Sequence, residues 1–163
     1  MDDRVSNFFK AKGLPLQALF TGEDTSTVQK AAEVLGVQDG QIAKSLALRL
    51  PTALAPAGVG VLVVMGTARL DNPKYKAAFH TKAKMLSAEE TLAETGFPVG
   101  GVCPFALPEG VAVFLDESLK QYDEVYPAAG TRDSAVKVEV ARLAEYTGGQ
   151  WVDVCKEAGA QVG

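Results

Sequence analysis

The stretch QIAKSLALRL, residues 41–50, predicts a β-strand with two different faces. Side chains alternate between the faces of a strand, so residues two apart lie on the same side. One face is aliphatic except for a single lysine: Ile42, Lys44, Leu46, Leu48 and Leu50. The other face is small or polar: Ala43, Ser45, Ala47 and Arg49.

Lys44 is the unusual residue of this strand, because a charge is costly to bury without a partner. Two interpretations are open from the pattern. In the first, Lys44 extends its amine to solvent over Ile42 and Leu46. In the second, the strand presents the ammonium to an anion or to a substrate in a partly dry site.

Length and composition indicate one globular domain over residues 1–163, with 47% hydrophobic and 22% charged residues. There is no apolar run of about 18 residues, and the N-terminus lacks a basic region followed by an apolar signal stretch. We therefore expect a cytoplasmic protein that does not associate with a membrane.

The histidine and cysteine residues that bind zinc are scarce. The chain has one histidine, His80, and two cysteines, Cys103 and Cys155, which are too few for a zinc cluster or a disulfide scaffold. We expect reduced thiols, no metal and no cofactor. A net charge of −4 argues against broad nonspecific binding of nucleic acid, so any such contact must be local.

Helix and strand signals alternate along the whole chain. Apolar spacing and end signals predict helices at residues 3–12, 26–36, 87–96 and 141–147, and a further helix that starts at Asn72. Ser26, Asn72 and Ser87 are the expected N-terminal caps. Strands are predicted at residues 41–50, 59–65, 111–115, 136–140 and 151–154.

The order of these elements favours an α/β (α+β) fold. Several strands follow one another through loops rather than through full crossover helices, which is typical of a mixed, barrel-like β-sheet surrounded by short helices. The helix that begins near Asn72 also starts the one basic cluster, residues 74–84, which we interpret as either a solvated face or an RNA contact.

The second candidate site is the glycine loop at residues 96–105, with sequence GFPVGGVCPF. Because glycine has no Cβ, successive N–H groups at Gly100 and Gly101 could converge on a substrate oxygen and form an oxyanion hole. The alternative is a tight turn between helix and strand.

The lysine motif QIAKSL and the loop GGVCP together resemble the YbaK/prolyl-tRNA-editing domain family. Matching segments are Ser26 to Val37, Arg69-Leu70-Asp71 and Phe114-Leu115-Asp116, and the resemblance covers residues 14–155. It implies a free-standing trans-editing deacylase that hydrolyses mischarged aminoacyl-tRNA, such as a small amino acid on proline tRNA. The implied partners are the acceptor end of the tRNA and prolyl-tRNA synthetase.

The resemblance also implies which residues form the site. The family's lysine and glycine loop correspond to Lys44 and Gly101 as catalytic residues. The implied substrate-binding residues are Phe20, Thr21, Ser45, Met65, Gly100, Val102, Cys103, Pro104 and Gly130. Lys44 would hold a phosphate, a ribose hydroxyl or the substrate carbonyl.

Three positions depart from the family pattern. Cys103 replaces a serine found in many members, Ser45 replaces the asparagine of alanine-clearing members, and Asp133 does not clearly match an acidic side chain of some members. A nucleophilic role for Cys103 is disfavoured, because no base is expected near it. The alternative function is a non-catalytic module that binds a tRNA end, a nucleotide or a synthetase.

Overall fold

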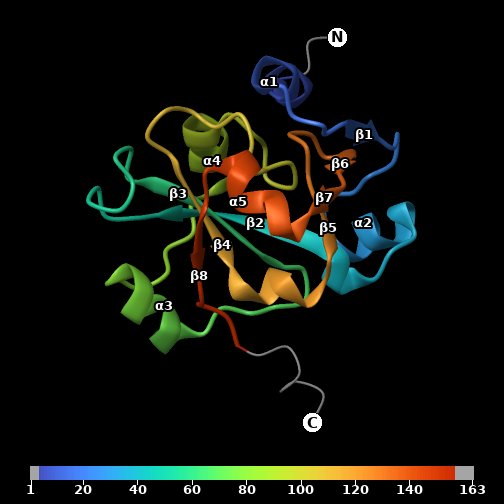
Figure 1. Cartoon of the computed structure of the whole chain (residues 1–163). Coiled ribbons are helices and arrows are strands. Elements are labelled where there is room, and N and C mark those ends of the chain that lie inside the picture. The colour runs from blue at the N-terminus through green and yellow to red at the C-terminus, as the bar shows by residue number, and fades with distance from the viewer. Residues whose placement is uncertain (1–3, 157–163) are drawn as a thin grey trace.

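The computed structural model describes residues 4–156 and contains a curled, mixed sheet with the strand order β7-β5-β2-β3-β4-β8 (Figure 1). These strands are β2 Ile42–Arg49, β3 Val59–Met65, β4 Ala112–Asp116, β5 Glu124–Pro127, β7 Val138–Glu139 and β8 Gln150–Val152. A separate two-stranded sheet pairs β1 (Ala18–Phe20) with β6 (Ser134–Val136).

Short helices surround the sheet. They are α1 Arg4–Lys12, α2 Val28–Leu35, α3 Asn72–Phe79, α4 Ala88–Thr95 and α5 Leu143–Thr147. Three 3-10 helices, η1 Asp39–Gln41, η2 Glu117–Gln121 and η3 Val140–Arg142, connect strands and helices. This architecture confirms the predicted α/β class with a barrel-like mixed sheet. None of the helices within residues 4–156 is long and apolar enough to cross a membrane.

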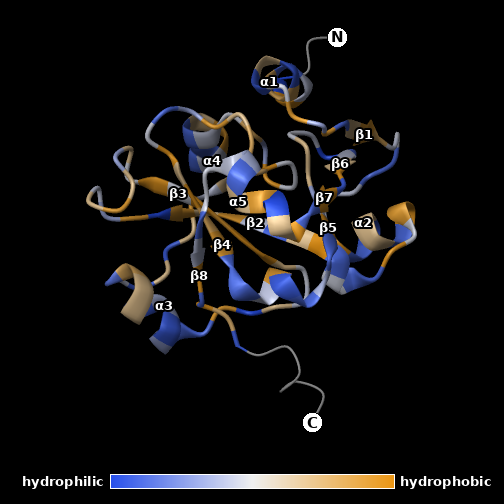
Figure 2. Cartoon of the chain, in the orientation of Figure 1, coloured by the Kyte–Doolittle hydropathy of each residue, from blue (hydrophilic) through white to orange (hydrophobic). Residues whose placement is uncertain are grey.

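Strand β3 is the centre of the sheet, and all seven of its residues are buried. It pairs antiparallel with β2 and parallel with β4. Val61 and Val63 pack into the core on one face of the sheet, and Leu62 and Val64 pack into the core on the other. The strands accordingly form the hydrophobic interior in Figure 2, as expected for an apolar run covered on both sides.

Two predicted helix starts are wrong by one residue. The cap of α2 is Thr27, whose hydroxyl accepts a hydrogen bond from Lys30 N, because Asp24 Oδ1 accepts from Ser26 N and holds Ser26 in the preceding turn. The cap of α3 is Asp71, whose carboxylate accepts from Lys74 N. A carboxylate at the N-terminus also favours the helix dipole.

Other local signals are confirmed. Ser87 caps α4 in a capping box with Glu90, and Gly96 ends that helix in the left-handed conformation. The predicted strand at residues 136–140 is instead divided around Lys137 into β6 and β7. The division arises because β6 pairs with β1 whereas β7 pairs with β5, so consecutive residues join different sheets.

Candidate functional site

Strand β2 is only partly paired on the edge that faces away from β3. Strand β5 pairs with it at Ile42 and Ala43 alone. Further along, Leu86 N donates to Ala47 O at 3.0 Å, where the chain after α3 takes up the pairing. Within the described residues, positions 44–46 of β2 therefore have no strand partner on this edge.

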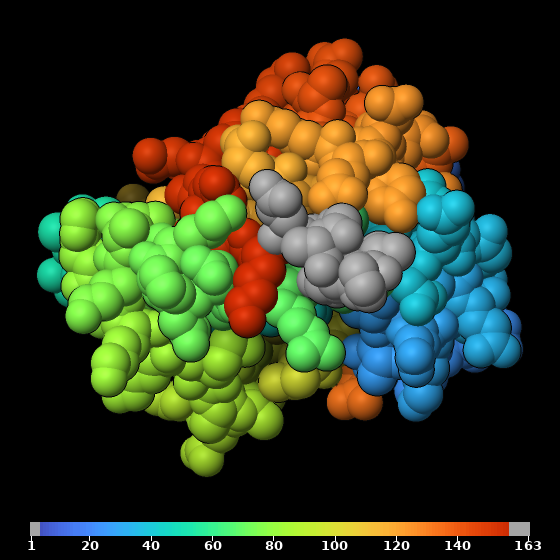
Figure 3. All heavy atoms as spheres, turned by 90° about the horizontal axis from the view of Figure 1, so that it is seen from below, coloured from blue at the N-terminus to red at the C-terminus, as the bar shows by residue number. Residues whose placement is uncertain are grey.

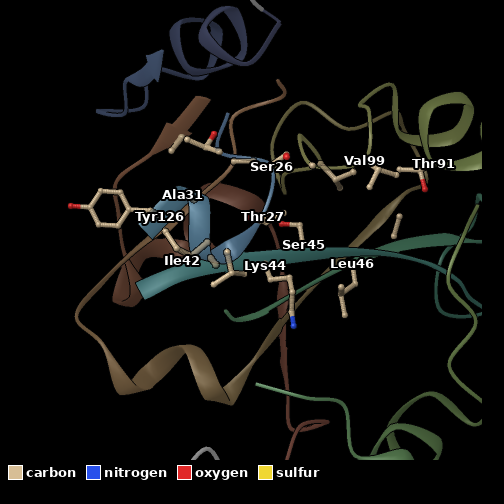
Figure 4. Close-up of a pocket in the computed structure, with 18 of the residues that line it drawn as sticks. Ser26, Thr27, Ala31, Ile42, Lys44, Ser45, Leu46, Thr91, Val99 and Tyr126 are labelled. Carbon is tan, nitrogen blue, oxygen red and sulfur yellow. The ribbon is translucent and has the colours of Figure 1, made fainter. Parts of the chain in front are cut away.

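A cavity of about 290 Å³ opens at this gap (Figure 4). Its walls come from β2, the N-terminal end of α2, the glycine loop, the chain around α4 and the β5–β6 connection. The lining includes Thr25, Ser26, Thr27, Ile42, Lys44, Ser45, Leu46, Thr91, Val99, Gly100, Val102, Tyr126 and Ser134. Most of this surface is apolar, with hydroxyl groups placed around it.

The side chain of Ser45 carries an unsatisfied hydrogen-bonding group in the cavity. Its Oγ is buried and has no hydrogen-bond partner. Figure 4 shows the side chain on the same side of β2 as Ser26 and Val99. Leaving a buried polar group without a hydrogen bond costs about 1–3 kcal/mol, so the presence of this hydroxyl needs an explanation. A bound ligand that hydrogen-bonds Oγ would supply one.

Lys44 points to the other side of β2, as alternation along the strand requires (Figure 4). Its Nζ donates to Ala68 O at 3.2 Å, and the residue is partly buried. Burial lowers the pKa of Lys44; Cys155 opposes this shift and the nearby Arg69 adds to it. The structure therefore places the Lys44 ammonium away from the glycine loop, although the stem of Lys44 lines the cavity.

The glycine loop forms a tight turn at the cavity wall. Gly101 N donates to Pro98 O at 2.9 Å, and Gly100 occupies the third position with a φ of +92°. This is the position at which a type II turn requires glycine. The Gly101 amide is thus used within the turn, whereas Gly100 and Val102 face the cavity.

The predicted residues that follow the turn lie behind it. Gly130 N donates to Gly101 O at 3.0 Å, which ties the turn to the β5–β6 connection. Cys103 is fully buried, and its Sγ donates to Phe105 O at 3.6 Å. Pro104 lines a different depression. Gly101, Cys103, Pro104 and Gly130 are not among the residues that line the cavity.

Three further predicted residues also lie outside the cavity lining. Phe20 is 53% exposed at the end of β1, where it pairs with Ser134. Thr21 is bound through its N–H and hydroxyl to Asp133 O. Met65 is buried in the core, and its N–H donates to Ser118 Oγ.

Sequence reasoning missed the polar residues that connect the turn to α2. The guanidinium of Arg132 donates to Ser26 Oγ at 3.2 Å and to Val99 O at 3.4 Å. This exposed cation thus bridges two walls of the cavity. Ser26 and Thr27 appeared in the sequence only as a helix start. No local signal marked Arg132, which bonds to Ser26 although the two residues are 106 positions apart in the sequence.

The opposite side of the β2–β3 pair carries a second polar group of residues. Asp116 is buried, and its carboxylate accepts hydrogen bonds from Ser118 N and Val154 N. Burial and the Asp116 carboxylate raise the pKa of Cys155 to about 12. The Cys155 thiol therefore remains protonated at neutral pH, which does not suit a nucleophile.

The basic cluster lies along and after α3. Lys76, His80, Lys82 and Lys84 are exposed, whereas Lys74 forms an ion pair with Asp153 at 3.1 Å. Viewed from below, the green chain around α3 forms one side of the molecule (Figure 3). This surface is continuous along the chain with Met85, which lines the cavity.

Comparison with known proteins shows the family. The model of the aminoacyl-tRNA editing domain matches residues 22–146. A Bacillus subtilis (strain 168) protein, “Uncharacterized protein YwhH”, is 42% identical over 138 residues, which cover 82% of this chain and 83% of the relative. “Putative Cys-tRNA(Pro)/Cys-tRNA(Cys) deacylase EbsC” of Enterococcus faecalis (strain ATCC 700802 / V583) is 29% identical over 133 residues, with 81% and 79% covered.

A solved structure has the same fold. The “putative trans-editing enzyme for prolyl tRNA synthetase” superposes with a TM-score of 0.82 at 30% identity and covers 94% of this chain and 96% of its own. The family match spans the residues that build the cavity from α2 to the β5–β6 connection. The chain belongs to the aminoacyl-tRNA editing domain family.

Proposed function

We propose that this protein is a free-standing deacylase that hydrolyses the ester of a mischarged aminoacyl-tRNA, with a small amino acid on proline tRNA as its substrate. The observation that carries the proposal is the cavity at the gap beside β2, which lies within the family match. It combines apolar walls with hydroxyl groups and an unpartnered Ser45 Oγ.

The size of the cavity favours a small aminoacyl group. Its volume of about 290 Å³ is just below the range of roughly 300–1,000 Å³ for small-molecule sites. The Val99, Gly100 and Val102 wall is held by the Gly101–Pro98 turn bond. A wall that is fixed by this hydrogen bond can limit the length of the substrate side chain that enters the cavity.

An aminoacyl ester is already activated, so positioning can supply much of the catalysis. In our proposal the aminoacyl group occupies the cavity, and water or a ribose hydroxyl attacks the carbonyl. The unpaired edge of β2 supplies main-chain polar groups there. Lys44 and Arg132 provide positive charge for the ribose and phosphate of the terminal nucleotide. Lys44 would leave the Ala68 carbonyl to do so, which its flexible stem permits.

A covalent mechanism at Cys103 has little support. The thiol is fully buried, points at the Phe105 carbonyl and lies outside the cavity lining. Without access to the ester carbon it cannot form a thioester. We therefore propose direct hydrolysis by a positioned oxygen nucleophile.

The test is a deacylation assay on a panel of tRNAs charged with matched and mismatched amino acids. We expect hydrolysis of a small amino acid on proline tRNA and sparing of prolyl-tRNA. Ser45→Leu, which would fill the cavity, should abolish turnover, whereas Lys137→Ala on the exposed Lys137–Glu124 pair should not change it. Binding of the panel without hydrolysis would support the binding-module alternative instead.

A further inference from the structure

We infer that Ser45 recognises the main chain of the aminoacyl group by pairing with it as a single residue of an antiparallel strand. The inference rests on the proposed function, because it concerns the substrate of the same cavity. The substrate α-amino group would donate to the Ser45 C=O, and the Ser45 N–H would donate to the ester carbonyl oxygen. The amino acid would thus be held by atoms that every amino acid shares.

The direction of the Ser45 main chain follows from the pairing at the end of the gap. Ala47 O accepts from Leu86 N, and Arg49 N donates to Lys84 O. Both odd-numbered residues therefore turn their main-chain groups away from β3. Because this direction alternates along a strand that pairs on both edges, Ser45 turns its N–H and C=O the same way, into the gap.

The gap has the length of one amino acid. On one end Ala43 pairs with Pro127, and on the other Leu48 pairs with Met85. Only positions 44–46 remain, a span of roughly 10 Å at about 3.3 Å per strand residue. A longer peptide would collide with the β5 end or with the chain at Met85. The space suits a single aminoacyl unit.

The hydrogen-bonding groups of an aminoacyl ester match this edge. In a hydrogen-bonded antiparallel pair, two residues exchange both of their N–H···O bonds. The substrate amino group would donate to Ser45 O, and Ser45 N–H would donate to the ester carbonyl oxygen. No Asp or Glu is among the described residues that line the cavity. The amino group must therefore find a carbonyl or hydroxyl acceptor there.

This pairing also determines where the rest of the substrate lies. Side chains of directly paired residues share a face of the sheet, so the substrate side chain would lie beside Ser45 Oγ and the Val99 wall. Strand β2 runs from Ile42 to Arg49, so the antiparallel ligand directs its ester toward the Ile42 end. The ribose would then leave the cavity near Thr27 and Tyr126, which line that end.

The first test uses nonhydrolysable analogues of the tRNA end. Alanine and propionic acid are each joined by an amide to 3′-amino-3′-deoxyadenosine, so that they differ only in the α-amino group. We expect the propionyl analogue to bind at least about tenfold more weakly, the effect of losing a charge-assisted hydrogen bond. Equal dissociation constants would overturn the pairing.

The second test separates the main chain of Ser45 from its side chain. Ser45→Ala keeps the N–H and loses only the hydroxyl, so it should weaken binding of the alanyl analogue less than Ser45→Pro does. Ser45→Pro also removes the N–H, which has no partner in the β5 ladder. We expect at least a tenfold loss in binding for folded Ser45→Pro, whose melting temperature is measured alongside.

The outcomes distinguish this inference from the proposed function. If Ser45→Pro does not fold, the comparison of alanyl and propionyl analogues on wild type still decides the pairing. Equal binding of both analogues, with deacylation intact, would overturn the pairing alone. If neither analogue binds and no aminoacyl-tRNA is hydrolysed, the proposed function itself fails.

Discussion

Substitution of Gly100 should distort the cavity wall, and its effect can be worked out from the structure. The residue has a φ of +92°, and an added Cβ would lie 2.7 Å from Ser26 Cβ and 3.3 Å from Ser26 Cα. Gly36 provides the matched control, because it has a φ of +71° and an added Cβ would meet no atom within 4 Å. Both Gly→Ala changes impose backbone strain, but only Gly100→Ala adds a collision.

The expected magnitudes differ accordingly. A side chain in the left-handed region costs about 1–2 kcal/mol at either position. Overpacking against Ser26 adds about 1–3 kcal/mol for Gly100→Ala alone. Since 1 kcal/mol corresponds to about 2–4 °C for a protein of this size, Gly100→Ala should melt at least about 2 °C below Gly36→Ala. Deacylation should fall for Gly100→Ala and remain for Gly36→Ala.

The assay combines thermal unfolding with single-turnover deacylation, and a double-mutant cycle with Ser26→Gly identifies the cause. Removing the Ser26 Cβ in the Gly100→Ala background should recover the stability lost to the collision, relative to Ser26→Gly alone. Equal melting temperatures for Gly100→Ala and Gly36→Ala, or no coupling to Ser26, would refute the reasoning.

Three further outcomes are expected. Lys44→Met should lower deacylation strongly yet raise the melting temperature, because burial lowers the pKa of Lys44 and penalises its charged form. This difference in stability between Lys44→Met and wild type should shrink as pH rises from the folded-state pKa towards 10.5, because Lys44 of the wild type then loses its charge and no longer destabilises the fold. A difference that grew with pH would contradict the reasoning. Cys103→Ser should keep substantial hydrolysis, its hydroxyl donating to the Phe105 carbonyl, and mass spectrometry of quenched protein should find no thioester in wild type. Tyr75→Phe should unfold at equal or higher denaturant concentration, because the buried Tyr75 hydroxyl lacks a partner and such a group costs about 1–3 kcal/mol; a clear loss of stability would show a missed partner.

Much of the fold could be predicted because its signals are local. The apolar run of β3 indicated burial on both faces, and the Ser87–Glu90 box marked the start of α4. Alternation along β2 correctly separated the face of Lys44 from that of Ser45. The predicted caps of α2 and α3 are each one residue away from the observed caps, because neighbouring polar side chains compete for the same unpaired N–H groups of the first helical turn.

The sequence by itself predicted the strand with Lys44, singled out the glycine loop at residues 96–105, and carried the resemblance to an editing family. Only the tertiary structure showed that Gly100 lines the cavity while the Lys44 ammonium lies away from the glycine loop, and that β2 has a gap beside Ser45. It also brought Arg132 to Ser26 and Val99. The physical reason is that periodicity and caps act over a few residues, whereas a cavity depends on where distant segments stop pairing.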